Sequence, residues 1–502
     1  MMIKYDKVVI AGSFHYPETE FNCFNKWLEF LSIFQPEKLY LLGSLVHFDL
    51  PQRKLSNSKL EEQLKNVKER LVNFRIAILE KIRKAVPNAE IFYLQGGTEQ
   101  NLKDWTEKQN LDFNQLIQLL ELEQLRIKYV PEGRIRIKKL LLTHGKHMYK
   151  DAVSSAKAEL KERGISGCST CSHHIGAHYR TDYRGEMVWY EAGCFAKDGA
   201  REPGQRSESA YSERGFLVGY FANHSKRFHI FPVLFNGKLV YGKKNSRKVF
   251  FDETLSNGLQ RIVLTGCHHH PFVHRKSFDA FLKFLRWFKP NVIYLTGDII
   301  DFPELSEFKS SKSPKVQASL GRNLKKVKKA LKQIREAAPE AKIYYLEGNH
   351  ERRVNSYLLQ NAPVLCDLPQ LRIPKLLGLK KLGIRWVVGG RKIYSFLVTH
   401  GSLVRKNSGD TAKAELERRG ISGCSSHTHR IGLYTKSDEL GTRFWYEIGT
   451  LTRFDLNWVR EKANWQRGFA VAYLNPKEGK KRIRIIQIPI INGTICFCGK
   501  EF

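Results

Sequence analysis

The sequence predicts an α/β protein made of two tandem copies of one domain, and two observations indicate this fold class. The first is internal repetition, because Ala156–Ser169 recurs as Ala412–Ser425 with 12 of 14 positions identical at an offset of 256 residues. The second is the alternation of apolar, β-rich runs with segments of helical periodicity. Such alternation is typical of parallel strands joined by helical crossovers.

The repetition continues beyond this segment. Trp189–Glu191 returns as Trp445–Glu447 at the same offset. A polar, basic stretch at Tyr241–Lys248, continued by a second polar stretch up to Gly258, has the composition of a connector. We therefore expect two domains, residues 1–250 and residues 251–502.

The second copy predicts its elements in a clear order. The expected elements are a strand at 261–266, a helix ending before Pro290, a strand at 292–296, a helix at 323–338 and a strand at 342–346. This order implies parallel pairing with right-handed crossovers. Three later segments, at 391–398, 442–448 and 468–473, predict a second and more mixed sheet.

Polar motifs follow the β-like runs of the second copy. They are Gly297–Asp301, Gly348–Glu351, His400–Gly401 and His427–His429. Ligands collect at the carboxyl ends of parallel strands, so we expect these side chains to meet at one edge of the sheet. Carboxylate, amide and imidazole donors in this order predict a two-metal phosphoester hydrolase.

The composition favours a polyanionic partner. The chain has 502 residues, 42% apolar content and a formal net charge of +34. Both halves are basic, since residues 1–250 hold 40 basic against 28 acidic residues and the rest holds 44 against 22. For a basic protein of this kind, nucleic acid is the commonest partner.

The sequence lacks an apolar run long enough for a membrane span and lacks the apolar core of a signal peptide at its start. We expect no membrane partner and a cytoplasmic location, which would be the cytoplasm of an infected cell if a phage encodes the protein. Nine irregularly spaced cysteines predict reduced thiols rather than a disulfide framework. Cys168/Cys171 and Cys496/Cys498 leave a structural metal open as the alternative.

The motifs resemble those of the calcineurin-like metallophosphoesterase superfamily, and most closely those of its phage and bacterial members. The resemblance covers nearly all of residues 261–490 and includes Leu346–Arg352, Ser426–Arg430 and Asn464–Ala470. It implies two tandem four-layer α-β-β-α sandwich domains. It also implies two divalent metal ions, of Mn, Zn, Fe or Mg, and a bridging hydroxide as the nucleophile.

The resemblance further implies a role for each motif residue. The implied metal ligands are Asp298 as the bridge, Asn349, His400 and His427 at one metal, and His269 and His429 at the other. His350 would be the catalytic histidine that stabilises or protonates the leaving oxygen. Asp301 and Glu351 would orient the ligands. The candidates for contact with substrate phosphate are Arg352, Arg353 and Arg430.

The sequence departs from the family at its first motif, where Cys267-His268-His269 stands in place of Asp-x-His. As a thiolate Cys267 would bind zinc or iron, whereas a protonated thiol would leave the site weak or empty. An alternative register pairs Gly266 with the missing aspartate and His268 with the histidine. We favour His269, because alternate residues of a strand end face the same side and Cys267 would then point with His269. In that register His268 and His270 are polar loop residues.

The first copy has lost most of these groups. The alignment of the two copies puts Ser44 at Asp298, His47 at Asp301, Gly97 at Asn349, Thr98 at His350 and Cys171 at His427. His15, His144 and His173 persist and, with Cys171, would suffice for a single metal. Without a bridging carboxylate a two-metal reaction is not expected. We expect a pseudoenzyme domain that packs on the second copy as an intramolecular pseudo-dimer.

Three functions are consistent with these features. The leading one is a metal-dependent phosphodiesterase or nuclease acting on nucleic acid. The second is a non-catalytic nucleic-acid-binding or structural protein made of two inactivated phosphoesterase domains. The third is a phosphatase for a small molecule or a protein, because the motifs define the metal chemistry and leave the substrate open.

Overall fold

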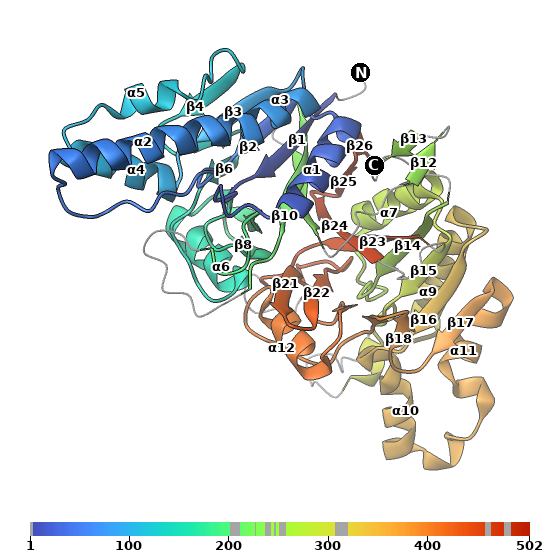
Figure 1. The fold of residues 1–502 in the computed structure, drawn as a ribbon. Helices are drawn as coiled ribbons and strands as arrows, with labels where there is room; N and C mark the ends of the chain where they lie inside the picture. The colour runs from blue at the N-terminus through green and yellow to red at the C-terminus, as the bar shows by residue number, and fades with distance from the viewer. Residues whose placement is uncertain are drawn as a thin grey trace. The chain divides into compact units, whose positions relative to one another are not determined.

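The computed structural model describes residues 4–200, 211–225, 227–235, 242–244, 247–249, 258–306, 320–456, 463–475 and 483–502. These residues fall into two compact units (Figure 1). Unit 1 consists of Met1–His178, Met187–Leu239 and Thr435–Thr442, and unit 2 consists of Tyr179–Glu186, Val240–Tyr434 and Arg443–Phe502. Within the expected connector, β12 (Gly242–Lys244) pairs antiparallel with β13 (Arg247–Val249), and residues 251–257 lie outside the described residues.

Unit 1 contains a six-stranded sheet of order β11-β10-β1-β2-β3-β4. Its strands are β1 (Tyr5–Ala11), β2 (Lys38–Leu41), β3 (Glu90–Leu94), β4 (Ile127–Val130), β10 (Gly215–Ala222) and β11 (Phe228–Leu234). The first four pair in parallel, whereas β10 and β11 add antiparallel strands. The helices along this sheet are α1 (Phe21–Phe34), α2 (Asn57–Phe74), the π-helix η1 (Arg75–Leu79), α3 (Glu80–Ala85), α4 (Gly97–Lys108) and α5 (Phe113–Gln118).

A second sheet of unit 1 has the order β8-β9-β7-β6-β5. Its strands are β5 (Arg134–Ile137), β6 (Leu140–Thr143), β7 (Ser166–Ser169), β8 (Ile175–Asp182) and β9 (Gly185–Ala192), and α6 (Ala152–Arg163) connects β6 to β7. Two mixed sheets with helices form the α/β sandwich that the sequence predicts.

Unit 2 repeats this plan. Its first sheet has the order β17-β16-β15-β14-β23-β24-β25-β26. The strands are β14 (Gln260–Thr265), β15 (Val292–Leu295), β16 (Lys342–Leu346), β17 (Ile384–Val387), β23 (Gly468–Leu474), β24 (Ile483–Ile491), β25 (Thr494–Phe497) and β26 (Lys500–Glu501). β14 to β17 pair in parallel, so their carboxyl ends share one edge.

The second sheet of unit 2 has the order β18-β19-β20-β22-β21. Its strands are β18 (Arg391–Ile393), β19 (Phe396–Val398), β20 (Gly423–Ser425), β21 (Ile431–Asp438) and β22 (Gly441–Ile448). The helices of the unit are α7 (Arg275–Phe288), η2 (Pro303–Leu305), α9 (Leu320–Ala337), α10 (Asn349–Asn361), η4 (Pro363–Leu365), η5 (Pro369–Leu371), α11 (Ile373–Leu376), η6 (Leu379–Leu382) and α12 (Asp410–Arg419).

The expected elements of the second copy occur with boundaries shifted by a few residues, and β16 has the predicted bounds. One assignment was wrong. Gly468–Leu474 does not join the second sheet but pairs antiparallel with β14 in the first. All seven of its residues are buried, so this strand suits the centre of a sheet that is covered on both faces.

A buried tryptophan explains why the most similar segment of the two copies changed so little. A Cβ on Gly167 would lie 2.3 Å from the Trp189 ring, and a Cβ on Gly423 would lie 2.5 Å from the Trp445 ring. The indole N–H of Trp189 donates to Ser169 Oγ at 2.7 Å, and that of Trp445 donates to its equivalent serine at 3.0 Å. Each strand therefore needs glycine and serine at these two positions.

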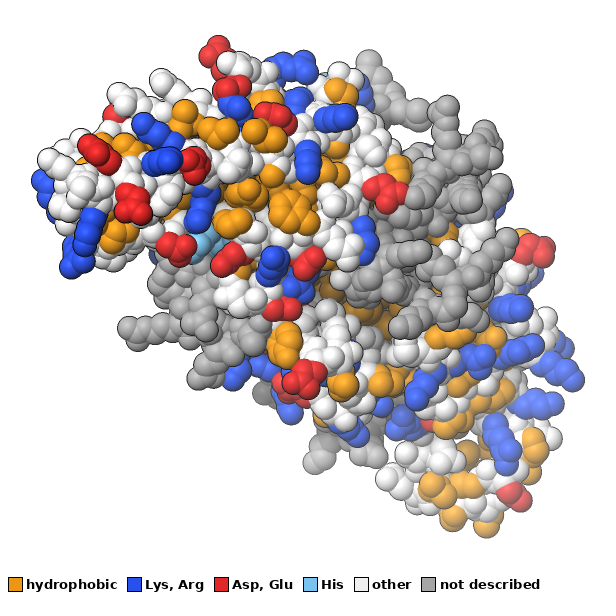
Figure 2. Space-filling model, in the orientation of Figure 1, with side chains coloured by type: hydrophobic (Ala, Val, Ile, Leu, Met, Phe, Trp, Pro, Cys, Tyr) orange, Lys and Arg blue, Asp and Glu red, His pale blue; other side chains and the backbone are white. Residues whose placement is uncertain are grey.

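The surface of the described residues is uneven in charge. Figure 2 shows basic side chains gathered over the part of unit 2 that carries α9 and β17, whereas basic and acidic side chains alternate over α2 and α4 of unit 1. All nine cysteines are free thiols. Within the described ranges no helix combines the length and apolar character needed to cross a bilayer.

Candidate metal centre

The motif residues of unit 2 lie just beyond the ends of its strands. Asp298 follows β15, Asn349 begins α10 directly after β16, and His400 follows β19. Asp298 adopts a left-handed backbone conformation, with φ of 51°, after Gly297 with φ of 91°. A Cβ on Gly348 would lie 2.2 Å from Asp298 Oδ1, so this glycine allows the start of α10 to approach the carboxylate.

Asp298 is the centre of the group. Its Oδ2 lies 3.2 Å from His400 Nε2 and 3.8 Å from the Nε2 atoms of both His269 and His350. Its Oδ1 accepts the backbone N–H of His350 at 2.9 Å. Burial raises the pKa of Asp298, but the neighbouring His400 and His350 lower it more, so its pKa lies well below the ordinary value. The carboxylate is therefore ionised.

The first set of ligands meets beside this carboxylate. His400 Nε2 lies 2.9 Å from Asn349 Oδ1 and 3.1 Å from His427 Nδ1. His400 Nδ1 donates to the carbonyl oxygen of Thr296 at 2.9 Å, which turns Nε2 toward the other ligands. Burial lowers the pKa of His427 to about 4, so this ring is neutral at physiological pH and has a lone pair for a cation.

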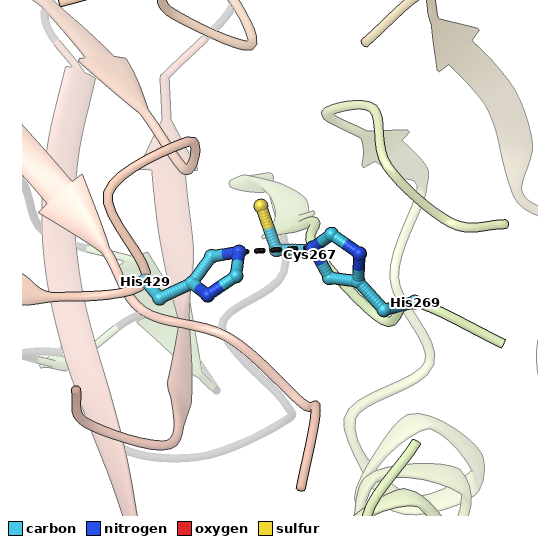
Figure 3. A group of neighbouring side chains, drawn as sticks. All are labelled: Cys267, His269 and His429. Carbon is cyan, nitrogen blue, oxygen red and sulfur yellow. Dashed lines mark hydrogen bonds between the residues drawn. The ribbon is translucent and has the colours of Figure 1, made fainter. Parts of the chain in front are cut away.

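The second set forms around His269 (Figure 3). Its Nε2 faces His429 Nε2 at 2.9 Å, and its Nδ1 lies 2.8 Å from Asp301 Oδ2. Burial lowers the pKa of both His269 and His429. Two neutral imidazoles with facing Nε2 atoms and an aspartate behind one of them form the arrangement that orients histidine toward a metal.

Cys267 lies between the two sets. It falls in one group of candidate ligand atoms with His269 and His429 and in another with Asp298 and His400, and the atoms of each group lie within 4.8 Å of one another. Burial and the charge of Asp298 raise the pKa of the thiol well above its ordinary value. The thiol is therefore protonated unless a bound cation stabilises the thiolate.

The surroundings of Cys267 and His269 differ from the sequence-based prediction in two respects. Cys267 and His269 do point together, but they lie beyond β14 and have left-handed φ values of 53° and 51°, so strand alternation is not the reason. His268 and His270 are buried, and His268 Nε2 lies 2.9 Å from Thr265 Oγ1. Their rings lie against Phe278 of α7, so they are core residues rather than polar loop residues.

His350 is oriented by Asp301 and Arg353. Its Nδ1 donates to the carbonyl oxygen of Asp301 at 2.8 Å, and its ring lies 4.5 Å from that of His269. Burial lowers the pKa of His350, but Asp298 and Asp301 raise it above the ordinary value. The Arg353 guanidinium lies 3.2 Å from His350 Nε2 and donates to the Asp301 carbonyl at 2.8 Å. This arrangement provides a proton-carrying ring beside a cation.

Only one of the three candidate phosphate-binding arginines contacts the described cluster. Arg352 pairs with Glu347 at 3.2 Å, and its side chain is largely exposed. Arg430 donates to the backbone carbonyls of Asn464 and Arg405. Arg353 is therefore the member whose guanidinium the structure brings to the ligands.

Glu351 holds the backbone of the centre together. Its carboxylate accepts the backbone N–H groups of Asp298, Ile299 and Gly348, each at 2.9 Å, and the hydroxyl of Tyr345 at 2.7 Å. Burial raises its pKa, yet a group surrounded by donors has no acceptor for a proton of its own. Glu351 thus fixes the turn of Asp298 against the start of α10.

Unit 1 retains the glutamate that holds these backbone segments together but lacks most of the metal ligands. Glu99 accepts the N–H groups of Ser44 and Gly96 at 2.8 Å and the hydroxyl of Tyr93 at 2.7 Å. His15 Nε2 still faces His173 Nε2 at 3.1 Å. Among the described residues, however, all groups of three candidate metal ligands lie in unit 2.

Sequence reasoning missed the role of Trp465. Its ring meets that of His429 edge-on, with centroids 4.5 Å apart. The neighbouring Gln466 donates its backbone N–H to the His429 carbonyl at 3.0 Å. The Asn464–Ala470 motif was a usable signal, but its fold partner is distant in sequence and could not be deduced from spacing.

Comparisons with known proteins find similar sequences for part of the chain. The family model described as calcineurin-like phosphoesterase matches residues 260–431. The chain is 27% identical over 252 residues to the Gene 54 protein of Mycobacterium phage D29, covering 48% of this chain and 97% of that protein. It is 26% identical over 253 residues to the Gene 54 protein of Mycobacterium phage L5, covering 48% and 98%.

Solved structures align over just under half of the chain. A Vps29 double mutant from Entamoeba histolytica has 12% identity, a TM-score of 0.24 and coverage of 47% of this chain and 96% of that one. A metallophosphoesterase from Sphaerobacter thermophilus has 11% identity, a TM-score of 0.24 and coverage of 46% and 88%. The nuclease MPE of Pseudomonas putida has 14% identity, a TM-score of 0.20 and coverage of 45% and 87%.

The family match concerns the part of the chain that forms unit 2. Residues 260–431, which carry the motifs of the metal centre, are similar to the calcineurin-like phosphoesterase family. Proteins of this class are phosphoester hydrolases that use divalent metal ions.

Proposed function

We propose that unit 2 is a metal-dependent phosphodiesterase that acts on nucleic acid. The observation that carries the proposal is the convergence of two sets of ligand atoms on one ionised carboxylate, Asp298, with His400 Nε2 at 3.2 Å on one side and His269 Nε2 at 3.8 Å on the other. A carboxylate shared between two ligand sets is what a two-metal site requires.

The donor set fits two divalent cations. Oxygen from Asp298 and Asn349 and neutral nitrogen from His427 suit Mn²⁺, Fe²⁺ or Zn²⁺, and the sulfur of Cys267 favours the softer ions. Two such ions, when bound, neutralise phosphate oxygens and lower the pKa of water.

The remaining residues carry out the proton and charge chemistry. His350 donates its Nδ1 proton to the Asp301 carbonyl, and its raised pKa favours the imidazolium form, whose second proton, on Nε2, can pass to the leaving oxygen of a phosphodiester. Arg353 supplies further N–H donors at the same place, and these suit phosphate oxygens. Asp298 stays ionised, would hold the metal ions, and accepts the backbone N–H of His350, which keeps that residue beside the centre.

The net charge of +34 favours a polyanionic substrate over a small phosphomonoester. In this proposal unit 1 is a pseudoenzyme, since it has Ser44 where unit 2 has Asp298 and Thr98 where unit 2 has His350. Its contribution would be stability and substrate binding.

The test is hydrolysis of bis-p-nitrophenyl phosphate and labelled DNA with added Mn²⁺. We expect His350→Ala to lower the rate by roughly 10²- to 10⁴-fold, as for loss of a general acid, and Asp298→Ala to lower it at least as much. The matched controls in unit 1, Ser44→Ala and Thr98→Ala, should keep wild-type rates. Equal rates in wild type and Asp298→Ala would refute the proposal.

One observation favours a second candidate, a non-catalytic binding protein. The thiol of Cys267 stands where the family has an aspartate, and burial keeps that thiol protonated in the absence of a cation. Absence of hydrolysis with Mn²⁺, Zn²⁺, Fe²⁺ and Mg²⁺, together with salt-sensitive DNA binding, would establish this candidate instead.

A further inference from the structure

Helix α9 presents a continuous row of lysines to solvent. Val327, Leu331 and Ile334 are buried beneath it. The exposed side is occupied by five lysines, which are Lys325, Lys326, Lys328, Lys329 and Lys332. Four of them follow the spacing i, i+3, i+4, i+7 and therefore form one stripe that is about 10 Å long at 1.5 Å per residue.

This stripe has little neutralising charge. Among the described residues, Lys332 pairs with Glu336, with 3.6 Å between Nζ and Oε1, and no ion pair to a described residue joins the other four lysines. Like charges three or four residues apart destabilise a helix. The row of lysines therefore destabilises α9, and a bound polyanion would reduce the repulsion between these charges.

The same surface continues onto η6. Arg335 of α9 donates from Nε to the Leu382 carbonyl at 2.9 Å and from Nη2 to the Gly383 carbonyl at 3.3 Å. These bonds hold η6 beside α9, and Lys380 and Lys381 of η6 are exposed. We call the seven lysines of α9 and η6 the basic face.

The tandem copy provides an internal comparison. Arg83 of unit 1 donates from Nε to the Leu125 carbonyl at 2.8 Å and from Nη2 to the Arg126 carbonyl at 2.8 Å, which is the same pattern as that of Arg335. Arg83 also donates to the Ala89 carbonyl, as Arg335 does to that of Ala341. These anchors align the C-terminal ends of the two helices, from the end of the π-helix η1 of unit 1 onward.

Over that aligned part, three lysines of the basic face have non-basic counterparts. Lys332 corresponds to Glu80, and Lys380 and Lys381 correspond to Glu123 and Gln124. The charge at these three positions is +3 in unit 2 and −2 in unit 1. This part of the basic face is thus a property of the copy that holds the metal centre, and the fold does not require it.

The stripe begins close to that centre. Asn323, two residues before the first lysine, donates from Nδ2 to Glu304 Oε1 at 2.6 Å. Glu304 belongs to η2, which follows Asp301 by two residues and packs against α10, the helix of His350. A ligand lying along α9 would therefore reach the rim of the site.

We infer that the basic face binds the phosphodiester backbone of nucleic acid and guides it to the metal centre, an inference that rests on the proposed function. Compact ammonium groups in a row match closely spaced phosphates. A lipid surface fits less well, because the apolar side of α9 is buried and offers nothing to insert into a bilayer.

The test is binding of a fluorescent 30-nucleotide DNA to the full chain in EDTA, across a series of salt concentrations. The variant replaces four lysines of the stripe with glutamine, Lys325, Lys328, Lys329 and Lys332. Each phosphate contact contributes roughly 0.7–0.9 to the slope of log affinity against log salt. We therefore expect the slope to fall by roughly 3 and the affinity at low salt to fall at least about tenfold.

A matched control removes the same charge from the equivalent helices of unit 1. The control variant replaces Lys65, Lys68, Lys81 and Lys84, which are also exposed, with glutamine. It should bind with the wild-type slope. A second variant, Lys380→Gln with Lys381→Gln, changes lysines of η6 rather than of the α9 stripe. It should lower the slope of log affinity against log salt by roughly 1–2.

Because binding is measured without metal, the result does not depend on hydrolysis. A slope that falls in the stripe variant supports the basic face even if wild type hydrolyses no bis-p-nitrophenyl phosphate, in which case the proposed function fails alone. Equal slopes for the stripe variant and its control would overturn the inference even in an active enzyme. Binding of the wild type to phosphatidylserine vesicles, with no binding to DNA, would also overturn it.

Discussion

Replacement of Glu351 by glutamine tests whether the metal centre depends on its backbone brace. Glu351 Oε2 accepts the N–H groups of Asp298 and Gly348, and Oε1 accepts that of Ile299 and the hydroxyl of Tyr345. A glutamine has only one acceptor oxygen, so its NH₂ group must face two of these four donors. Two bonds to a charged acceptor are then lost, each worth about 1.5–3 kcal/mol. We expect a loss of roughly 3–6 kcal/mol in the free energy of unfolding.

Unit 1 supplies the control, because Glu99 makes the same four bonds to Ser44, Leu45, Gly96 and Tyr93. Glu99→Gln should cost a similar free energy of unfolding of its unit but leave Mn²⁺ affinity and hydrolysis near wild-type values. Glu351→Gln should lower both. The assay pairs urea unfolding with Mn²⁺ titration in the folded range. Unchanged Mn²⁺ affinity in Glu351→Gln, with a loss of stability equal to that of the control, would refute the role of the brace in positioning Asp298.

Three further predictions concern single residues. Burial raises the pKa of Glu191 to about 8, above the unfolded value of 4.5, so the free energy of unfolding falls by up to roughly 5 kcal/mol as pH rises from 4.5 to 8. Glu191→Gln should remove this part of the pH dependence in urea unfolding, and an unchanged dependence would contradict the prediction. Gly348→Ala would place a Cβ 2.2 Å from Asp298 Oδ1 and displace that carboxylate, so it should lower the rate of hydrolysis at least about 100-fold. The equivalent change in unit 1, Gly96→Ala, should leave the rate of hydrolysis unchanged. Cys267→Asp restores a carboxylate and should tighten Mn²⁺ binding in calorimetry by at least about tenfold, and weaker binding would show that the thiolate is the better ligand.

The sequence was sufficient for the parts of the fold that depend on local pattern. β16 has the predicted bounds, and α7 ends at Phe288 before Pro290, because burial periodicity and proline act over a few residues. The placement of Gly468–Leu474 beside β14 could not be predicted, since a wholly apolar strand has no alternation that marks its sheet.

The same distinction between local pattern and distant contacts applies to the candidate site. Asp298 and His400 could be nominated because each follows a strand, and parallel strands bring such positions to one edge. The contact of Trp465 with His429 depends on a loop returning from a distant strand, and the left-handed turn at Cys267 depends on its N–H reaching the Gly297 carbonyl. Neither has a signature in spacing.

The central claim is that unit 2 holds two divalent metal ions on either side of Asp298. The most direct measurement is the number of Mn²⁺ ions bound per chain at saturation, determined by elemental analysis after removal of free metal. We expect two per wild-type chain, close to none in Asp298→Ala, and two in the unit 1 variant Ser44→Ala. Fewer than one ion per wild-type chain, or equal metal content in wild type and Asp298→Ala, would contradict this account.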